Sequence, residues 1–188
     1  MSETLRAFIA IELPETAVTF VIRIQETLKS YRFKVKWVQP ENMHLTLKFL
    51  GEINREDRVK IEDAISDAGK DCGPIQLSVK GMGVFPGVKR PRVVWCGLKG
   101  DTASLVHLQG QLDEKLIDLG FSKEKRPFKG HLTLGRVKGS ISPEKIIDAM
   151  KEISGFGSKP FKVEAITLFS SDLKPSGAVY TRLKSISL

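Results

Sequence analysis

The tetrapeptide His-Leu-Thr-Leu occurs twice in this chain, beginning once at His44 and once at His131. On a β-strand, residues i and i+2 point to the same side, so each copy would present one imidazole and one hydroxyl together while its leucines face a core. The first copy supplies Thr46 and the second supplies Thr133. Histidine titrates near neutral pH, so one ring can accept a proton while another donates one. Two such pairs in one cleft would suit phosphodiester cleavage by a general base and a general acid, which requires no metal.

The repetition is what makes this motif informative. A single His–Thr pair on a solvent-facing strand is ordinary, whereas a chance repeat of all four residues among three histidines has a probability on the order of 10⁻³. The flanking segments repeat as well. Duplication for stability alone would explain two α+β units, but it would leave the paired histidines and threonines unexplained. The pattern therefore favours a catalytic site shared by two halves.

Hydrophobic periodicity predicts the same elements around both copies. Each half should run strand, helix, motif strand, helix, strand. Around the motif strands, these elements cover about 6–11, 17–28, 54–68 and 74–79 in the first half, and about 92–97, 105–119, 142–153 and 160–165 in the second. Asn54 and Ser142 are the predicted N-caps of the helices that follow the motifs.

These elements predict an α+β protein with a single domain over 1–188. Its repeat halves should cover about 5–84 and 91–183, joined by a hairpin between them. The last strand, 178–183, should follow a turn at 174–177.

Composition excludes several other classes. With 41% apolar and 28% charged residues, the chain is typical of a globular protein with its own core. The apolar run at 7–11 is too short for a secretory signal, and no stretch approaches the roughly 20 apolar residues of a membrane span. Cys72 and Cys96 show neither metal-ligand spacing nor the density of a disulfide scaffold. The net charge of +8 favours phosphate-bearing partners. We therefore expect a cytoplasmic protein.

Longer segments around the motifs resemble one known family. They are Arg6-Ala-Phe-Ile-Ala-Ile-Glu-Leu-Pro, His44-Leu-Thr-Leu-Lys-Phe-Leu-Gly-Glu, Pro91-Arg-Val-Val-Trp and Phe128-Lys-Gly-His-Leu-Thr-Leu-Gly-Arg. Together they resemble the two-histidine (2H) phosphoesterase superfamily and, within it, the RNA 2′,3′-cyclic phosphodiesterases, also called 2′-5′ RNA ligases. The resemblance extends to about Leu183 and departs at Gly130, where the family pattern has proline.

The resemblance implies a bilobal fold of two pseudo-symmetric halves, with antiparallel sheets lining a central cleft and helices outside. It also implies hydrolysis of RNA 2′,3′-cyclic phosphate ends to 2′-phosphate without metal or cofactor. ATP-independent 2′-5′ ligation would follow if a 5′-hydroxyl replaced water. The family's roles would make His44 the proton donor and His131 the proton acceptor, while Thr46 and Thr133 would hold the non-bridging oxygens. The expected partner is RNA with a 2′,3′-cyclic phosphate end, tRNA halves among the candidates, and the expected state is a monomer that binds no membrane.

Phe49 and Arg136 each stand five residues after a motif histidine and are candidate substrate-binding residues. They could flank a terminal base, and the arginine could also bind phosphate. Strict alternation sends residue i+5 to the opposite face, so this interpretation requires a bulge near Lys48 and near Gly135. For Phe49, a role as core filler remains an equal alternative.

A basic run leads into the second motif and comprises Lys123, Lys125, Arg126 and Lys129. It could steer RNA toward the cleft or be a solvated face. The third histidine, His107, falls on the polar side of its helix and is predicted to be a surface residue.

Two other functions remain open. A 2H enzyme could act on a small cyclic nucleotide or an ADP-ribose cyclic phosphate with the same catalytic set. The chain could also be a non-catalytic RNA-binding module of the same fold.

Overall fold

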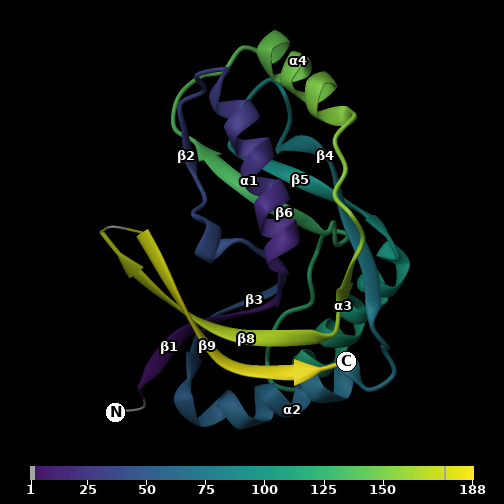
Figure 1. Ribbon diagram of the computed structural model, residues 1–188. Helices are drawn as coiled ribbons and strands as arrows, with labels where there is room; N and C mark the ends of the chain where they lie inside the picture. The colour runs from purple at the N-terminus through teal and green to yellow at the C-terminus, as the bar shows by residue number, and fades with distance from the viewer. Residues whose placement is uncertain (1–2, 176) are drawn as a thin grey trace.

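Figure 1 shows the computed structural model, which describes residues 3–175 and 177–188. The elements in chain order are β1 (Thr4–Glu12), α1 (Glu15–Lys29), β2 (Val35–Trp37), the 3₁₀ helix η1 (Pro40–Asn42), β3 (His44–Asn54), the 3₁₀ helix η2 (Arg55–Asp57), α2 (Arg58–Gly69), β4 (Ile75–Phe85), β5 (Val93–Gly100), α3 (Thr102–Ile117), β6 (His131–Val137), α4 (Pro143–Ser154), β7 (Phe161–Val163), β8 (Ala165–Lys174) and β9 (Gly177–Ser187). The strand ladders are antiparallel, which confirms the predicted α+β class.

The strands form one curled sheet in the order β7-β4-β5-β6-β3-β1-β8-β9, and β2 pairs with the end of β6. The motif strands β6 and β3 are central neighbours. The third strand of each sequence half pairs with the first strand of the other half. β4 of the first half pairs with β5 of the second, and β8 of the second half pairs with β1 of the first. The expected sheets of the two halves are therefore continuous, and each side of the sheet contains strands from both halves.

The helices cover this sheet at its two ends. In Figure 1, α1 and α4 lie toward the top of the view, whereas α2 lies at the bottom; α2 packs against α3, and α4 packs against β4. Most of the apolar stripe predicted for each of α1 to α4 is buried; Ile24, Ile65, Leu108 and Ile146 are fully buried examples. These side chains belong to one core that includes both halves of the chain. The prediction is wrong for Ile147, which is exposed on α4.

The two motif strands meet at Leu45 and Leu132, which are paired across the junction of β3 with β6. Both leucines are buried, as predicted, and so are Leu47 and Leu134. Extending the antiparallel register by one residue in each direction places His44 opposite Thr133 and Thr46 opposite His131. The register therefore sets the histidine of each half opposite the threonine of the other.

Several boundaries differ from the sequence predictions. The prediction that Asn54 caps α2 is wrong: Asn54 ends β3, the turn η2 intervenes, and α2 begins at Arg58. Ser142 does cap α4, since its hydroxyl accepts from the backbone N–H of Lys145 at 3.4 Å. The strand predicted over 160–165 is divided between β7 and β8. The predicted turn at 174–177 includes Ser176, which lies outside the described residues.

Both cysteines, Cys72 and Cys96, are buried free thiols. Within the described part of the chain, no helix combines the length and apolarity needed to cross a membrane.

Candidate active site

Both motif histidines begin a strand and are held by the same hydrogen bond. Nδ1 of His44 lies 2.8 Å from the carbonyl oxygen of Asn42, and Nδ1 of His131 lies 2.7 Å from the carbonyl oxygen of Lys129. A carbonyl can only accept, so Nδ1 carries a proton in each ring. This leaves Nε2 of each neutral ring with a lone pair, available to take or, once protonated, to give a proton.

The surroundings of His44 are largely aromatic. Its ring centroid lies 4.8 Å from that of Phe8 and 5.3 Å from that of Tyr180, which meets it edge-on. Burial lowers the pKa of His44 below its ordinary value of 6.5, and the hydrogen bond to the Asn42 carbonyl offsets part of this effect. The free protein therefore favours the neutral form of this ring.

His131 stands in a different aromatic corner. Phe85 meets its ring edge-on at 5.0 Å, and Trp95 lies 6.0 Å from it. The ammonium of Lys129 sits 4.5 Å from the centroid of the Trp95 ring, a cation–π contact. The two histidines are therefore alike in backbone anchoring and different in environment, a distinction that the two identical tetrapeptides do not reveal.

A bulge turns Phe49 onto the histidine face of β3. Ala10 of β1 pairs with Thr46 and the preceding Ile9 pairs with Lys48, so Leu47 is an extra residue in the ladder. Phe49 is 63% exposed, and the alternative that it fills the core is wrong.

A β-bulge has the same effect on β6. Val94 of β5 pairs with Gly135 and Trp95 pairs with Thr133, so Leu134 is the extra residue and Arg136 is turned outward. A Cβ on Gly135 would lie 2.4 Å from Cγ1 of Val35, so glycine permits the close approach of β2 here. The irregularities required near positions 48 and 135 are both present.

A pocket of about 230 Å³ brings most of the predicted site residues together. Its lining includes His44, Thr46, Thr133, Phe49 and Arg136. His131 does not line this pocket, but the strand register places it opposite Thr46. One imidazole, two hydroxyls and a guanidinium around a cavity of this size can bind a phosphate group and exchange a proton with it.

Sequence reasoning did not select several other residues of the pocket wall. Arg6 enters from β1, and Ala178 and Tyr180 come from β9. Ser171 of β8 also lines the pocket; from the sequence, its role was open between ligand contact and capping. Arg6 opens a segment used for the family resemblance, and that position was its only signal. Tyr180 had none, because its approach to His44 depends on the crossover of β8 and β9 to the side of β1.

The basic run is not equally available to a ligand. Lys123 forms an ion pair with Glu114, and Lys129 covers Trp95, whereas Lys125 and Arg126 are exposed. His107 is exposed on α3, as predicted.

Comparison with known proteins agrees with this geometry. The family model described as LigT like Phosphoesterase matches residues 11–95 and 99–180. The chain belongs to this family. It is 37% identical over 183 residues to a Methanothermobacter thermautotrophicus protein named RNA 2′,3′-cyclic phosphodiesterase, covering 97% of this chain and 98% of that one. A Methanocaldococcus jannaschii protein of the same name is 35% identical over 180 residues, covering 96% of this chain and 99% of that one.

Solved structures of other proteins share the fold of this chain. A Thermus thermophilus protein superposes with a TM-score of 0.81 at 28% identity, covering 98% of each chain. Escherichia coli LigT complexed with 3′-AMP gives a TM-score of 0.75 at 28% identity, covering 99% of each chain. This member of the LigT-like phosphoesterases is accordingly an enzyme, and its fold agrees with the expectation of an α+β protein with a curled antiparallel sheet.

Proposed function

We propose that this protein hydrolyses RNA 2′,3′-cyclic phosphate ends to 2′-phosphates. The observation that carries this proposal is the paired arrangement of the motifs: each imidazole is anchored through Nδ1, and the strand register sets each histidine opposite the threonine of the other half. The relatives named RNA 2′,3′-cyclic phosphodiesterase support the substrate class.

In the proposed reaction, Nε2 of His131 removes a proton from water as its oxygen attacks phosphorus. The bond from phosphorus to the 3′ oxygen breaks, and Nε2 of His44 protonates that oxygen. The 2′-phosphate remains on the ribose. Thr46 and Thr133 donate hydrogen bonds to the non-bridging oxygens, where they counter the charge of the transition state. This division of the donor and acceptor roles rests on the family resemblance.

The lowered pKa of His44 is compatible with a role as proton donor if the ring becomes protonated when the substrate binds. An anionic phosphate in the pocket favours the imidazolium form, so substrate binding would raise the pKa of His44. After turnover His44 must regain a proton. It also borders a second cavity of about 350 Å³, lined by Glu12 and Arg182 among others, through which solvent can reach it.

In this scheme, Phe49 and Arg136, which the two bulges turn outward, recognise the terminal base. Phe49 offers an exposed ring for stacking, and Arg136 offers a guanidinium for stacking or for phosphate. Ligation would use the same steps with a 5′-hydroxyl in place of water, yielding a 2′-5′ linkage without ATP.

The proposal is tested by incubating the protein in EDTA with a short RNA that ends in a 2′,3′-cyclic phosphate, with and without a second RNA bearing a 5′-hydroxyl. Conversion of the end to a 2′-phosphate is expected, and the second RNA should yield some 2′-5′-linked product. A 3′-phosphate product would overturn the assignment of the leaving oxygen. Failure to turn over any cyclic phosphate would favour the binding-module alternative.

A further inference from the structure

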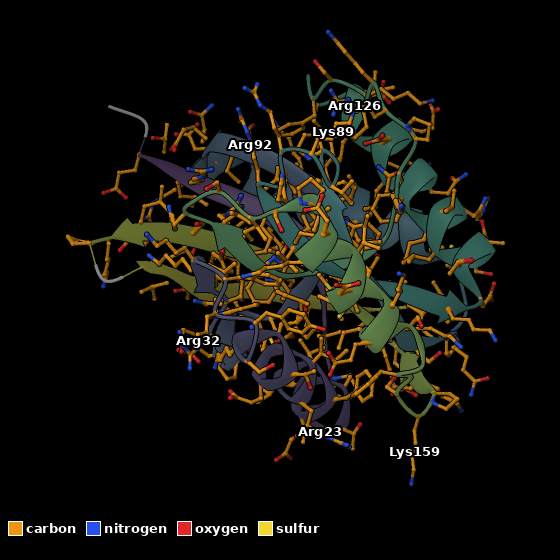
Figure 2. All side chains as sticks on the ribbon, turned by 90° about the horizontal axis from the view of Figure 1, so that it is seen from above. Arg23, Arg32, Lys89, Arg92, Arg126 and Lys159 are labelled. Carbon is orange, nitrogen blue, oxygen red and sulfur yellow. The ribbon has the colours of Figure 1, made fainter. Side chains whose placement is uncertain are left out.

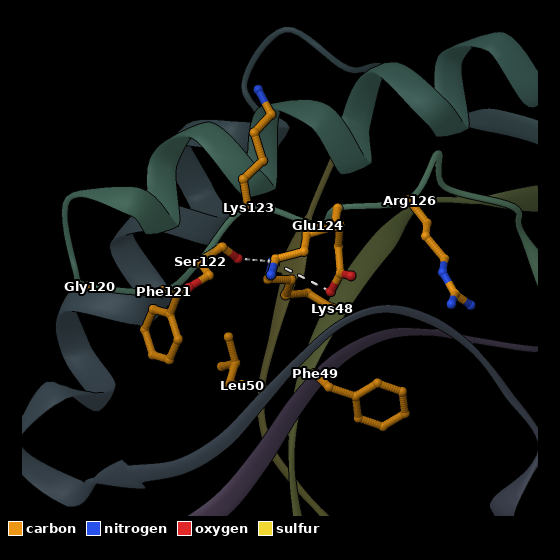
Figure 3. Close-up of a pocket in the computed structure, with 10 residues that line it drawn as sticks. Lys48, Phe49, Leu50, Gly120, Phe121, Ser122, Lys123, Glu124 and Arg126 are labelled. Carbon is orange, nitrogen blue, oxygen red and sulfur yellow. Dashed lines mark hydrogen bonds and ion pairs between the residues drawn. The ribbon is translucent and has the colours of Figure 1, made fainter.

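A third pocket, distinct from the cavity beside Glu12 and Arg182, adjoins the catalytic pocket and shares Phe49 with it. It has a volume of about 560 Å³ and is lined by residues 48–50 of β3 and residues 120–126, the loop between α3 and β6 (Figure 3). We call it the 120–126 groove. The hydrolytic steps described above use none of its residues except Phe49, so its role is unassigned.

The floor of the groove is a fixed structural feature. The ammonium of Lys48 is buried and lies 2.7 Å from Asp113 Oδ1, 2.7 Å from the carbonyl oxygen of Ser122 and 3.6 Å from Glu124 Oε1. Asp113 in turn accepts the backbone N–H of Glu124 at 3.1 Å. These contacts engage Lys48 fully and hold the loop against β3, so Lys48 is a structural tether and not a ligand for phosphate.

The cations that remain available lie on the loop. Figure 3 shows the side chain of Lys123 pointing away from Phe49 and across the helix above the pocket, and Lys123 pairs with Glu114 of α3. Arg126 points to the side of the groove on which the Phe49 ring lies. Within the described residues, Lys125 and Arg126 are exposed and no ion pair involves either of them. The one acidic group of the lining, Glu124, is already opposed by Lys48.

We propose that the 120–126 groove binds the RNA chain on the 5′ side of the cyclic phosphate, with a backbone phosphate held by Arg126 and Lys125. This inference rests on the proposed function. The catalytic pocket, at about 230 Å³, is smaller than the roughly 300 Å³ at which pockets for drug-sized ligands begin, so it holds little beyond the terminal phosphate and its ribose. The rest of an RNA must leave it, and the groove shares the exposed side chain of Phe49 with the catalytic pocket.

The chemistry of the groove matches a single-stranded nucleic acid. Aromatic side chains with nearby cations bind such strands by stacking and charge neutralisation. A cyclic mononucleotide ends at the catalytic pocket and reaches neither cation. The groove would therefore distinguish an RNA end from a small cyclic nucleotide.

The test compares a cyclic mononucleotide with a short RNA that ends in the same nucleotide, using the double variant R126A/K125A. KM for the RNA should rise about 10-fold or more from the loss of charge-assisted contacts, while kcat/KM for the mononucleotide stays within about twofold of wild type. The matched control is R23A/K159A, which removes the same charge from exposed positions on the opposite side of the molecule from Arg126 in the view of Figure 2. The control should leave both substrates unaffected.

Binding measured separately from turnover distinguishes failure of this inference from failure of the proposed function. Fluorescence anisotropy of the same RNA carrying a 3′-phosphate should show a dependence of log Kd on log salt concentration that is flatter in R126A/K125A by about 0.7, the value for one neutralised phosphate of a single strand. Three results would overturn the proposed role of the groove. They are equal effects of R126A/K125A on the RNA and the mononucleotide, equal effects of R23A/K159A and R126A/K125A on the RNA, and a salt slope that R126A/K125A leaves unchanged. A wild-type protein that binds RNA in this way without turning over any cyclic phosphate would overturn the proposed function and leave the groove supported.

Discussion

Leu45 of β3 is paired with Leu132 of β6, and each leucine directly follows a motif histidine. This junction joins the two sides of the curled sheet and sets the relative position of the catalytic candidates. Because the register is antiparallel, extending it by one residue each way sets His44 opposite Thr133 and His131 opposite Thr46. The site is thus assembled from both halves of the sequence.

Replacing either His44 or His131 with alanine should lower kcat by about 10² to 10⁴, as expected for the loss of a positioned acid or base. Neither ring is part of the buried core, so far-UV circular dichroism and the melting temperature should stay close to wild type. The third histidine provides the matched control: H107A removes an exposed imidazole on α3 and should retain full activity. Near-normal turnover by H44A or H131A would contradict the mechanism.

The His44 ring should titrate below pH 6.5 in the free protein, because its burial lowers the pKa. NMR titration of the three imidazoles, assigned with single His→Ala variants, measures this directly. Inorganic phosphate should raise the pKa of His44, since a nearby anion favours the imidazolium. A value at or above 6.5 that phosphate does not change would contradict this account.

Single variants assign the limbs of the pH profile to the two histidines. A proton donor must be charged, and its charged fraction falls as the pH rises through its pKa. The residual activity of H44A should therefore lack the falling limb of kcat/KM, because only the requirement for an unprotonated acceptor remains, and that of H131A should lack the rising limb. If H44A instead lacks the rising limb, the donor and acceptor roles are reversed.

Removing a hydroxyl from Thr46 or Thr133 should weaken transition-state binding while preserving shape. T46V and T133V should each lose about 10- to 100-fold in kcat/KM, the range for a hydrogen bond to a charged group. T46S and T133S retain the hydroxyl and serve as controls that should stay much closer to wild type. A larger loss in the serine variants than in the valine variants would show that packing of the methyl group, and not hydrogen bonding, is what matters.

The buried pair of Lys48 with Asp113 should dominate the stability of the loop that precedes β6. K48M leaves the carboxylate of Asp113 buried without its partner, which costs about 3–5 kcal/mol in comparable cases. Urea denaturation should show a lowered midpoint. The exposed pair of Lys70 with Asp67 offers the control, and K70M should change the midpoint little because solvent screens that pair. Similar midpoints for K48M and K70M would refute the tether.

Local sequence patterns were sufficient for much of this structure. Periodicity located α1, α2, α3, α4 and the motif strands, because side-chain spacing on one element depends only on the geometry of that element. The same reasoning placed Leu45 and Leu132 in the core and required an irregularity before Phe49 and Arg136. It also identified the family through His44, His131 and the residues around them.

Only the tertiary structure decided how these elements combine. The crossover of β4 and β8, the single continuous sheet and the approach of Tyr180 to His44 depend on contacts between residues far apart in the chain, on which local periodicity carries no information. The exposure of Phe49 was decided by the bulge in β3, and the low pKa of His44 by the surroundings that bury it. The two identical tetrapeptides therefore place their histidines in different environments. The side chains packed around each copy, and not its own four residues, determine how far each ring is shielded from water.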